Sequence, residues 1–219
     1  MIDSILFFGA LPQLLKGLWV SLHIAFISSC IGVIFGTIIA LAQGTTSKCL
    51  QGILFFYVNI IRGTPMLIQI LFAYYVLPQW KIMLDPFWTA SIMIGLNSSA
   101  YISQVMRSGI QSIPKGQWEA AYVLGFSKIQ TLRFIIMPQA IKNVLPSLGN
   151  EFVTLIKDSS LASIIGVTEL AKEGRIIISR TYDSLTIFAA MALLYLAVTW
   201  TVSYIVYRLE KRMNTHAFN

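Results

Sequence analysis

The side chains that could bind or react with a polar molecule are few, and several lie inside long apolar stretches. Glu151, Thr154 and Asp158 are three and then four residues apart, so they share one face of a helix, and Lys157 lies beside them. Charged side chains at membrane depth usually face a bundle interior or an aqueous cavity, because exposing them to hydrocarbon is unfavourable. We interpret this face as a candidate wall of a path for a charged solute.

A second polar face is formed by Asn97, Tyr101 and Gln104, again at helical spacing. A zwitterionic solute presents a carboxylate and an ammonium group, so its path needs cationic partners and acidic or carbonyl partners. One hypothesis is that the two faces line a translocation path. The alternative is that the charges pair with one another and that the amides form interhelical hydrogen bonds. Both interpretations remain open at this point.

The segment Arg62-Gly63-Thr64-Pro65 interrupts an otherwise apolar stretch. Pro65 removes an intrahelical hydrogen bond and its ring clashes with the preceding turn, so we predict a kink here. For Arg62 we favour a structural role over a place in the path, because its long side chain can reach back and satisfy the broken helix.

Other kinds of chemistry find little support. His23 and His216 lie at opposite ends of the chain, and Cys30 and Cys49 have neither disulfide nor metal-ligand spacing. We therefore expect no enzyme active site and no metal site. The sequence has no G-x-x-x-x-G-K-[ST] phosphate loop, so we do not expect the chain to hydrolyse ATP. The net charge is +7, but the basic residues do not gather on an aromatic-rich polar face, so nucleic acid is not an expected partner.

The elements that must position these side chains are membrane-spanning helices. Of the 219 residues, 56% are hydrophobic and 11% are charged, whereas soluble domains carry about 25% charged residues. Lys, Arg, Asp and Glu are absent from residues 17–47, 86–106 and 184–207, and each run can cross a hydrocarbon core that needs roughly 20 helical residues. The sequence predicts an all-α polytopic membrane protein with one domain, residues 1–219. We expect five spans, at about 19–42, 51–77, 86–106, 146–168 and 184–207.

The basic residues between the spans predict the orientation. One side of the membrane receives ten of them and the other side five. The side with ten holds the C-terminus and the long loop at about residues 107–138. Cytoplasmic loops carry the excess of Lys and Arg, so the C-terminus and this loop are expected in the cytoplasm.

The loop at residues 107–138 is too polar to cross a bilayer but is strongly patterned. Pro114 can open a helix, and Gly125 can end it, because glycine accepts the left-handed conformation common just after helices. Ser127 and Gln130 have the spacing of a capping box. A second helix is then expected to run to about residue 137, where Pro138 ends it. The pattern predicts two short helices joined by a sharp turn, with small residues at Ala120 and Ala121.

This loop resembles the EAA loop of ABC importer permeases. The match lies in Glu119-Ala120-Ala121, in glycine four residues later and in Ile135-Ile136-Met137-Pro138, where the family has Ile-x-Leu-Pro. Further segments resemble the polar amino-acid branch of that family, which includes glutamine and histidine permeases. These segments are residues 62–65, 97–101, 107–113, 138–140, 149–152 and 155–161. In this chain Gln104 stands where many relatives have Glu.

The resemblance implies a type I ABC importer transmembrane domain whose loop is a coupling helix seated in a cleft of an ATPase subunit. The resemblance implies that six residues either contact the ATPase subunit or shape the surface that does so: Glu119, Ala120, Ala121, Gly125, Ile135 and Pro138. ATP and Mg²⁺ would be held by the partner ATPase, with no cofactor on this chain. A second permease subunit, identical or different, and a periplasmic or surface amino-acid-binding protein complete the expected assembly.

The functional prediction is therefore a permease subunit in the inner membrane of a bacterial cell. It would move a polar amino acid, with glutamine as the first candidate, by alternating access driven by the partner ATPases. The alternative is a gradient-driven secondary transporter or channel for amino acids. Such carriers often show inverted repeats, and five spans do not divide into two halves.

Overall fold

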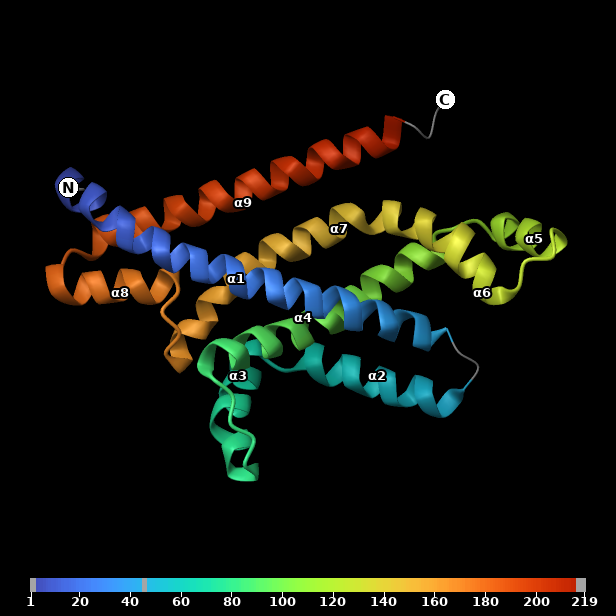
Figure 1. Ribbon diagram of the computed structural model, residues 1–219, viewed down its shortest axis with the longest axis horizontal. Helices are drawn as coiled ribbons and strands as arrows, with labels where there is room; N and C mark the ends of the chain where they lie inside the picture. The colour runs from blue at the N-terminus through green and yellow to red at the C-terminus, as the bar shows by residue number, and fades with distance from the viewer. Residues whose placement is uncertain (1–2, 45–46, 216–219) are drawn as a thin grey trace.

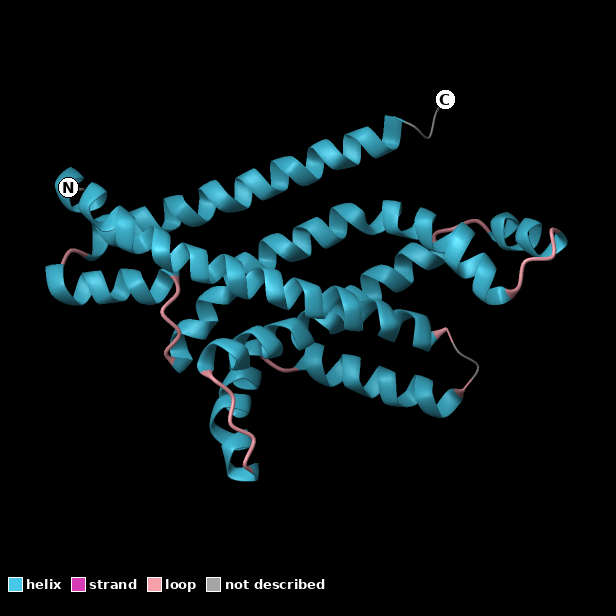
Figure 2. Ribbon diagram, in the orientation of Figure 1, coloured by secondary structure: helices cyan, strands magenta, loops and turns pink. Residues whose placement is uncertain are grey.

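The computed structural model describes residues 3–44 and 47–215, and the elements in these residues are all helices (Figure 2). His216 lies outside the described residues. The α-helices in chain order are α1 (Ser4–Gln43), α2 (Lys48–Gly63), α3 (Met66–Val76), α4 (Pro86–Gln111), α5 (Lys115–Val123), α6 (Lys128–Gln130), α7 (Met137–Asp158), α8 (Leu170–Thr181) and α9 (Ser184–Thr215). Helices α1, α2, α4, α7 and α9 run along the length of the molecule, whereas α3 projects to one side (Figure 1). The short helices α5 and α6 lie at the same end of the molecule as the end of α9, and α8 lies at the opposite end beside the start of α1.

The first span is predicted at about 19–42, and the structure has a longer helix, α1 (Ser4–Gln43). Its start is set by Asp3, whose side chain accepts hydrogen bonds from the backbone N–H groups of Ile5 and Leu6. Pro12 lies inside the helix. The third and fifth spans begin where they are predicted but also extend further, as α4 (Pro86–Gln111) and α9 (Ser184–Thr215).

The second span is predicted at about 51–77 with a kink at Pro65, and the structure has a complete break of the helix at that point. The structure has α2 (Lys48–Gly63) and α3 (Met66–Val76), which continues into the 3₁₀ turn η1 (Leu77–Trp80), and the two parts are bent by 102°. Thr64 is extended, as residues before proline tend to be, and Pro65 forms the N-cap of α3. The proline therefore breaks the helix and redirects the chain.

The fourth span is predicted at about 146–168, where the structure has the second half of one α-helix and a 3₁₀ helix. Helix α7 (Met137–Asp158) starts nine residues earlier and contains Pro146 in its interior. The 3₁₀ helix η3 (Ser159–Ile165) follows it, and Gly166 ends η3 with φ +97°. The apolar signal does not mark the ends of α7, because residues with ionisable side chains lie along this helix.

The count of five spans is not confirmed by length and composition. Two helices of the described residues, α1 and α9, are long and apolar enough to cross a membrane. The number of candidate spans rises to three if the bent pair of α2 and α3 is counted as one span. Helices α4 and α7 have 26 and 22 residues, which gives them about 39 and 33 Å of length. Their polar residues lower the hydropathy, and in α4 most of these are buried against other helices.

The core is formed where α1 packs closely on α4. A side chain at Gly36 of α1 would collide with Ile102 and with the backbone oxygen of Ser99, and one at Gly95 of α4 would collide with Ile31. Small residues let helix backbones approach in membranes, where packing replaces the hydrophobic effect as the driving force. This close contact fixes α4, which carries one of the two predicted polar faces.

Helix α8 (Leu170–Thr181) closes the far end of the bundle between α1 and α9. The carboxylate of Glu169 caps this helix and is fully buried. It accepts hydrogen bonds from the backbone N–H groups of Ala171 (2.9 Å) and Lys172 (2.8 Å) and from the hydroxyls of Ser21 and Tyr195, both at 3.2 Å. One side chain thus joins α1, α8 and α9.

Candidate functional site

A hollow of about 490 Å³ lies where the break between α2 and α3 meets α4 and α7. This volume falls within the range of ligand pockets, about 300 to 1,000 Å³. The hollow is called the break pocket below. It is lined by residues 62–66 and by Asn97, Tyr101, Glu151, Thr154, Leu155 and Asp158.

The break pocket brings together most of the polar residues predicted to line a path. Asn97 and Tyr101 come from α4, and Glu151, Thr154 and Asp158 come from α7. Two predicted residues are not among those that line it. Gln104 lies one turn further along α4 and donates a hydrogen bond to Ser103 Oγ at 3.1 Å, and Lys157 is exposed on another side of α7.

The wall at the break is held by an amide that the sequence analysis missed. Gln69 Nε2 lies within hydrogen-bond distance of the backbone oxygens of Ile61 (2.9 Å) and Thr64 (3.2 Å) and of Thr64 Oγ1 (2.7 Å). Asn97 Nδ2 donates to Gln69 Oε1 at 3.0 Å. The oxygens left without helical partners by Pro65 are thereby satisfied, and the break is tied to α4. A glutamine four residues after a proline in an apolar segment is the signal that could have identified it.

The positive group of the break pocket is Arg62. Its guanidinium carbon lies 5.2 Å from the centre of the Tyr101 ring, a cation–π contact. This contact orients the side chain along the pocket wall. The sequence analysis favoured a structural role for Arg62, and the structure places the residue both at the helix break and in the lining of the hollow.

The negative groups of the break pocket are on α7. Glu151 Oε1 accepts a hydrogen bond from Ser98 Oγ at 2.8 Å, which joins α7 to α4. Thr154 is turned toward its own helix, where its hydroxyl donates to the backbone oxygen of Asn150 at 3.1 Å. Asp158 ends α7 and is half-buried. One guanidinium and two carboxylates therefore share a polar hollow, an arrangement suited to a molecule with both charges.

The second predicted site is the loop after α4, here called the docking loop, residues 112–138. Helix α5 (Lys115–Val123) ends as predicted, with Gly125 at φ +82°. The backbone N–H groups of Gly125 and Phe126 donate to the oxygens of Tyr122 and Ala121, each at 3.0 Å. This is the Schellman pattern, which needs a residue in the left-handed region after the helix.

The surface of the docking loop is unusually apolar for an exposed segment. Glu119 and Ala120 are exposed, whereas Ala121 is buried. Around them Val123, Leu124 and Ile129 are 87%, 74% and 78% exposed. Exposed apolar residues close together in this way are typical of surfaces that contact another molecule.

The second helix of the docking loop begins as predicted, with the capping box of Ser127 and Gln130 at the start of α6 (Lys128–Gln130). The predicted end at Pro138 is wrong. The chain passes through a π-helical segment, η2 (Thr131–Ile136), directly into α7. Met137 N–H bonds to the oxygen of Leu132, five residues back. The wider turn makes room for Pro138, which has no N–H to donate, and so the helix continues.

Ile135 and Pro138 are the last two residues predicted to act in the docking loop. Ile135 is half-buried and packs against a small apolar cluster with Ile113 and Ile136, and Pro138 is exposed. Helix α7 carries Pro138 near its start and Glu151 near its end, which are about 20 Å apart along the axis. The docking loop and the break pocket are therefore connected by one helix (Figure 1).

The chain is similar in sequence to known membrane transport proteins. Residues 32–215 match the family described as "Binding-protein-dependent transport system inner membrane component". The chain is 37% identical to the glutamine transport system permease protein GlnP of Escherichia coli (strain K12), over 93% of this chain and 94% of GlnP. It is also 37% identical to the L-cystine transport system permease protein TcyB of Bacillus subtilis (strain 168), over 94% of this chain and 88% of TcyB.

A solved structure resembles the whole molecule. It is described as an amino acid ABC transporter with histidines, and it superimposes with a TM-score of 0.90 at 36% sequence identity. The match covers 97% of this chain and 99% of the other.

Proposed function

Because the chain belongs to the family of binding-protein-dependent transport system inner membrane components, we propose that it moves a polar amino acid, with glutamine as the first candidate. It is an amino-acid ABC importer permease and not an enzyme. The comparisons favour this importer over a gradient-driven carrier or channel. The break pocket is the observation that carries the proposal about the cargo.

The charges of the break pocket match an amino acid in its zwitterionic form. Arg62 offers a cation for the carboxylate of the solute, and Glu151 and Asp158 offer acceptors for its ammonium group. Asn97 and Thr154 supply neutral polar groups that suit a side-chain amide. These residues lie on three separate helices, so their relative positions change if the helices move during transport.

Glutamine is proposed ahead of other cargoes for two reasons. GlnP is among the most similar relatives, and the pocket has amide and hydroxyl partners beside its charges. TcyB, an L-cystine permease, is equally similar, and the arginine permease ArtQ of Bacillus subtilis (strain 168) is 33% identical, so polar amino acids as a class are the coarser proposal. Gln104, which stands outside the lining, does not decide between them.

The partners are proposed from family membership and from the docking loop. An ATPase subunit, which holds ATP and Mg²⁺, covers the exposed apolar surface around Glu119, Ala120 and Gly125. A second permease subunit completes the wall of the path, because one bundle of this size does not enclose it. A binding protein delivers the amino acid on the side opposite the docking loop, and the C-terminus lies in the cytoplasm.

The test is uptake of labelled amino acids by liposomes that contain the purified complex. We expect ATP-dependent uptake of glutamine, with Arg62→Gln lowering uptake at least about tenfold because one charge-assisted contact to the carboxylate is lost, a change of about 1.5 to 3 kcal/mol. Arg175→Gln on α8 removes the same charge far from the pocket and should leave uptake near the unchanged rate.

Two results would contradict the proposal. If the liposomes take up no polar amino acid in an ATP-dependent way, the cargo assignment is wrong. Equal loss of uptake in Arg62→Gln and Arg175→Gln would remove the break pocket from the path, even if glutamine were transported.

A further inference from the structure

We propose that the C-terminal end of α9 carries a binding site for the headgroup of an anionic phospholipid. A hollow of about 430 Å³ lies there, called the basic hollow below, and it is lined by Tyr204, Tyr207, Arg208, Lys211 and Arg212. Neither the break pocket nor the docking loop uses these residues. The proposal depends on the membrane placement of α9 and is independent of the cargo.

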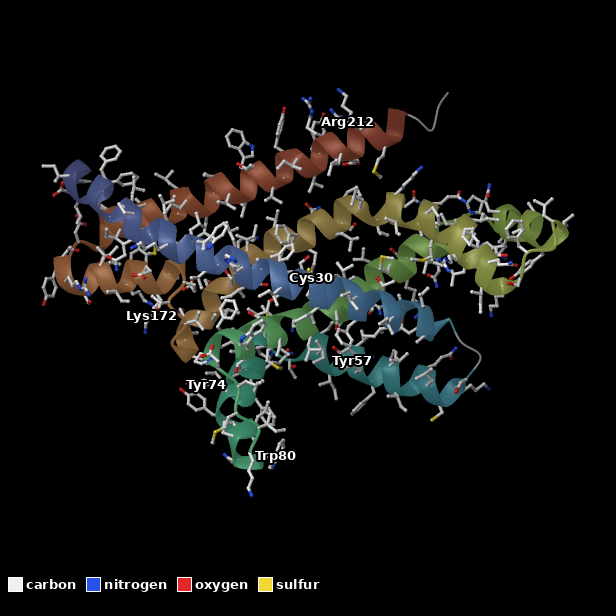
Figure 3. All side chains as sticks on the ribbon, in the orientation of Figure 1. Cys30, Tyr57, Tyr74, Trp80, Lys172 and Arg212 are labelled. Carbon is white, nitrogen blue, oxygen red and sulfur yellow. The ribbon has the colours of Figure 1, made fainter. Side chains whose placement is uncertain are left out.

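The residues of the basic hollow form one stripe on the helix. Tyr204, Arg208 and Arg212 follow at intervals of four, and Tyr207 and Lys211 are also four apart, so all five lie within about 140° of the helix circumference. The other side of α9 faces the bundle, where Val206 packs against Gly149 of α7. Figure 3 shows Arg212 on the side of α9 turned away from α7.

The same stripe continues into an apolar surface toward the middle of α9. Leu193, Leu196 and Trp200 are 53%, 61% and 74% exposed. Trp200 and Leu193 precede Arg208 by about 12 and 22 Å along the axis, and one leaflet of a hydrocarbon core about 30 Å thick is about 15 Å deep. The outward face of α9 therefore changes from apolar, through aromatic, to cationic over the length of one phospholipid.

The arrangement of the polar groups suits a phosphate. Arg208 Nη1 donates a hydrogen bond to the hydroxyl of Tyr204 at 3.1 Å, and its guanidinium carbon lies 5.7 Å from the ring of the same residue. This holds the planar guanidinium in place, and guanidinium groups bind phosphate oxygens in pairs. Lys211 and Arg212 add two more cations beside it.

A lipid fits this face better than a protein partner does. The buried centre of a protein interface is depleted in charged residues, whereas three cations lie together here. Tyrosine and tryptophan next to cations at a helix end are typical of the level of lipid headgroups. Basic clusters at that level attract anionic lipids, with a free energy that grows with each Lys or Arg.

The experiment measures lipid binding to the purified full-length chain in detergent by native mass spectrometry. Phosphatidylglycerol and phosphatidylcholine with the same acyl chains are titrated separately. The test variant is Arg208→Gln/Lys211→Gln/Arg212→Gln. The matched control is Lys172→Gln/Arg175→Gln/Arg180→Gln, which removes three cations from α8 at the opposite end of the molecule.

We expect phosphatidylglycerol to bind more tightly than phosphatidylcholine to the unchanged chain and to the control. The test variant should bind phosphatidylglycerol roughly a hundredfold more weakly, and Arg208→Gln alone about fivefold, because each basic residue near the surface contributes a similar share. The single variant keeps the test decisive if the triple variant does not fold. Glycerol phosphate at equal concentration should not displace the lipid, because it has no acyl chains for the apolar part of the face.

Three results would overturn the proposal. They are no preference for phosphatidylglycerol, equal weakening in the α8 control, and displacement of the lipid by glycerol phosphate. The last would mean that the basic hollow binds a soluble anion.

Discussion

Gly125 controls the direction of the docking loop through its own backbone. Its φ of +82° lies in the region where a side chain with a Cβ atom is unfavourable by roughly 1 to 2 kcal/mol. Open space surrounds the position, so the effect of a substitution comes from the backbone. This makes the turn between α5 and α6 a place where shape can be changed while packing is kept.

At the residue scale we expect Gly125→Val to reduce ATP-driven uptake strongly and to weaken the association of the ATPase, because the turn can no longer present α5 and α6 in this arrangement. The measurement is co-purification of the ATPase together with uptake. Gly125→Asn is the matched control, since asparagine tolerates the left-handed region. Unchanged association and uptake in Gly125→Val would show that the loop does not dock the ATPase.

Helical spacing predicts which polar residues share a helix face, because it depends only on local geometry. Asn97 and Tyr101 on one helix and Glu151, Thr154 and Asp158 on another were named from spacing, and the structure places them around one hollow. Gln69 and Glu169 were missed, because their partners are distant in sequence or are backbone atoms exposed by a break. Gln69 binds oxygens freed at Pro65, and Glu169 meets helices α1 and α9 from the start of α8.

Helices α4 and α7 touch through a glycine. A Cβ atom at Gly109 would collide with Val144 Cγ1 and lie 3.2 Å from the backbone oxygen of Ala140. The pair of helices that forms the break pocket is therefore held at a spacing that a single methyl group would increase.

At the element scale we expect Gly109→Ala to destabilise the chain by about 1 to 3 kcal/mol, the usual effect of overpacking. The measurement is thermal unfolding of the purified chain in detergent. Val144→Ala in the same chain should recover part of the loss, because it removes the colliding group. Gly52→Ala on α2, where nothing lies within 4 Å of the added atom, serves as the control. A loss in Gly109→Ala that Val144→Ala does not reduce would contradict this contact.

Element boundaries were predicted well where a local signal marks them. Pro86 begins α4, and Ser127 with Gln130 caps α6, as the sequence indicates. The ends of α7 were not predictable in this way. Proline often ends a helix, but the chain continues through Pro138 after a π-helical segment, in which Thr131 and Ile136 are buried.

The whole molecule has two unlike ends. The docking loop and the end of α9 lie at one end, and α8 and the start of α1 lie at the other (Figure 1). Composition predicted the membrane class and the helical fold, because long apolar runs have few other solutions. It did not predict the 102° turn between α2 and α3, which depends on how Gln69 and Asn97 meet across the break.

At the scale of the molecule we expect the two ends to lie on opposite sides of the membrane. In a chain with Cys30→Ser and Cys49→Ser, a cysteine placed at Ser127 should react with a membrane-impermeant maleimide in inverted vesicles and not in cells with a permeabilised outer envelope. A cysteine placed at Ser179 on α8 should show the reverse. Labelling of both positions from the same side would contradict the orientation and the crossing by α7.

The π-helical segment η2 has a mechanical consequence for the helix that follows it. A π turn holds more residues than an α turn, so the docking loop and the face that bears Glu151 are out of phase with a regular α-helix. One residue of helix corresponds to about 100° of rotation and 1.5 Å of rise. If η2 changed to regular α-helix, α7 would turn about its own axis, and the carboxylates of the break pocket would swing to a new direction while the docking surface kept its shape.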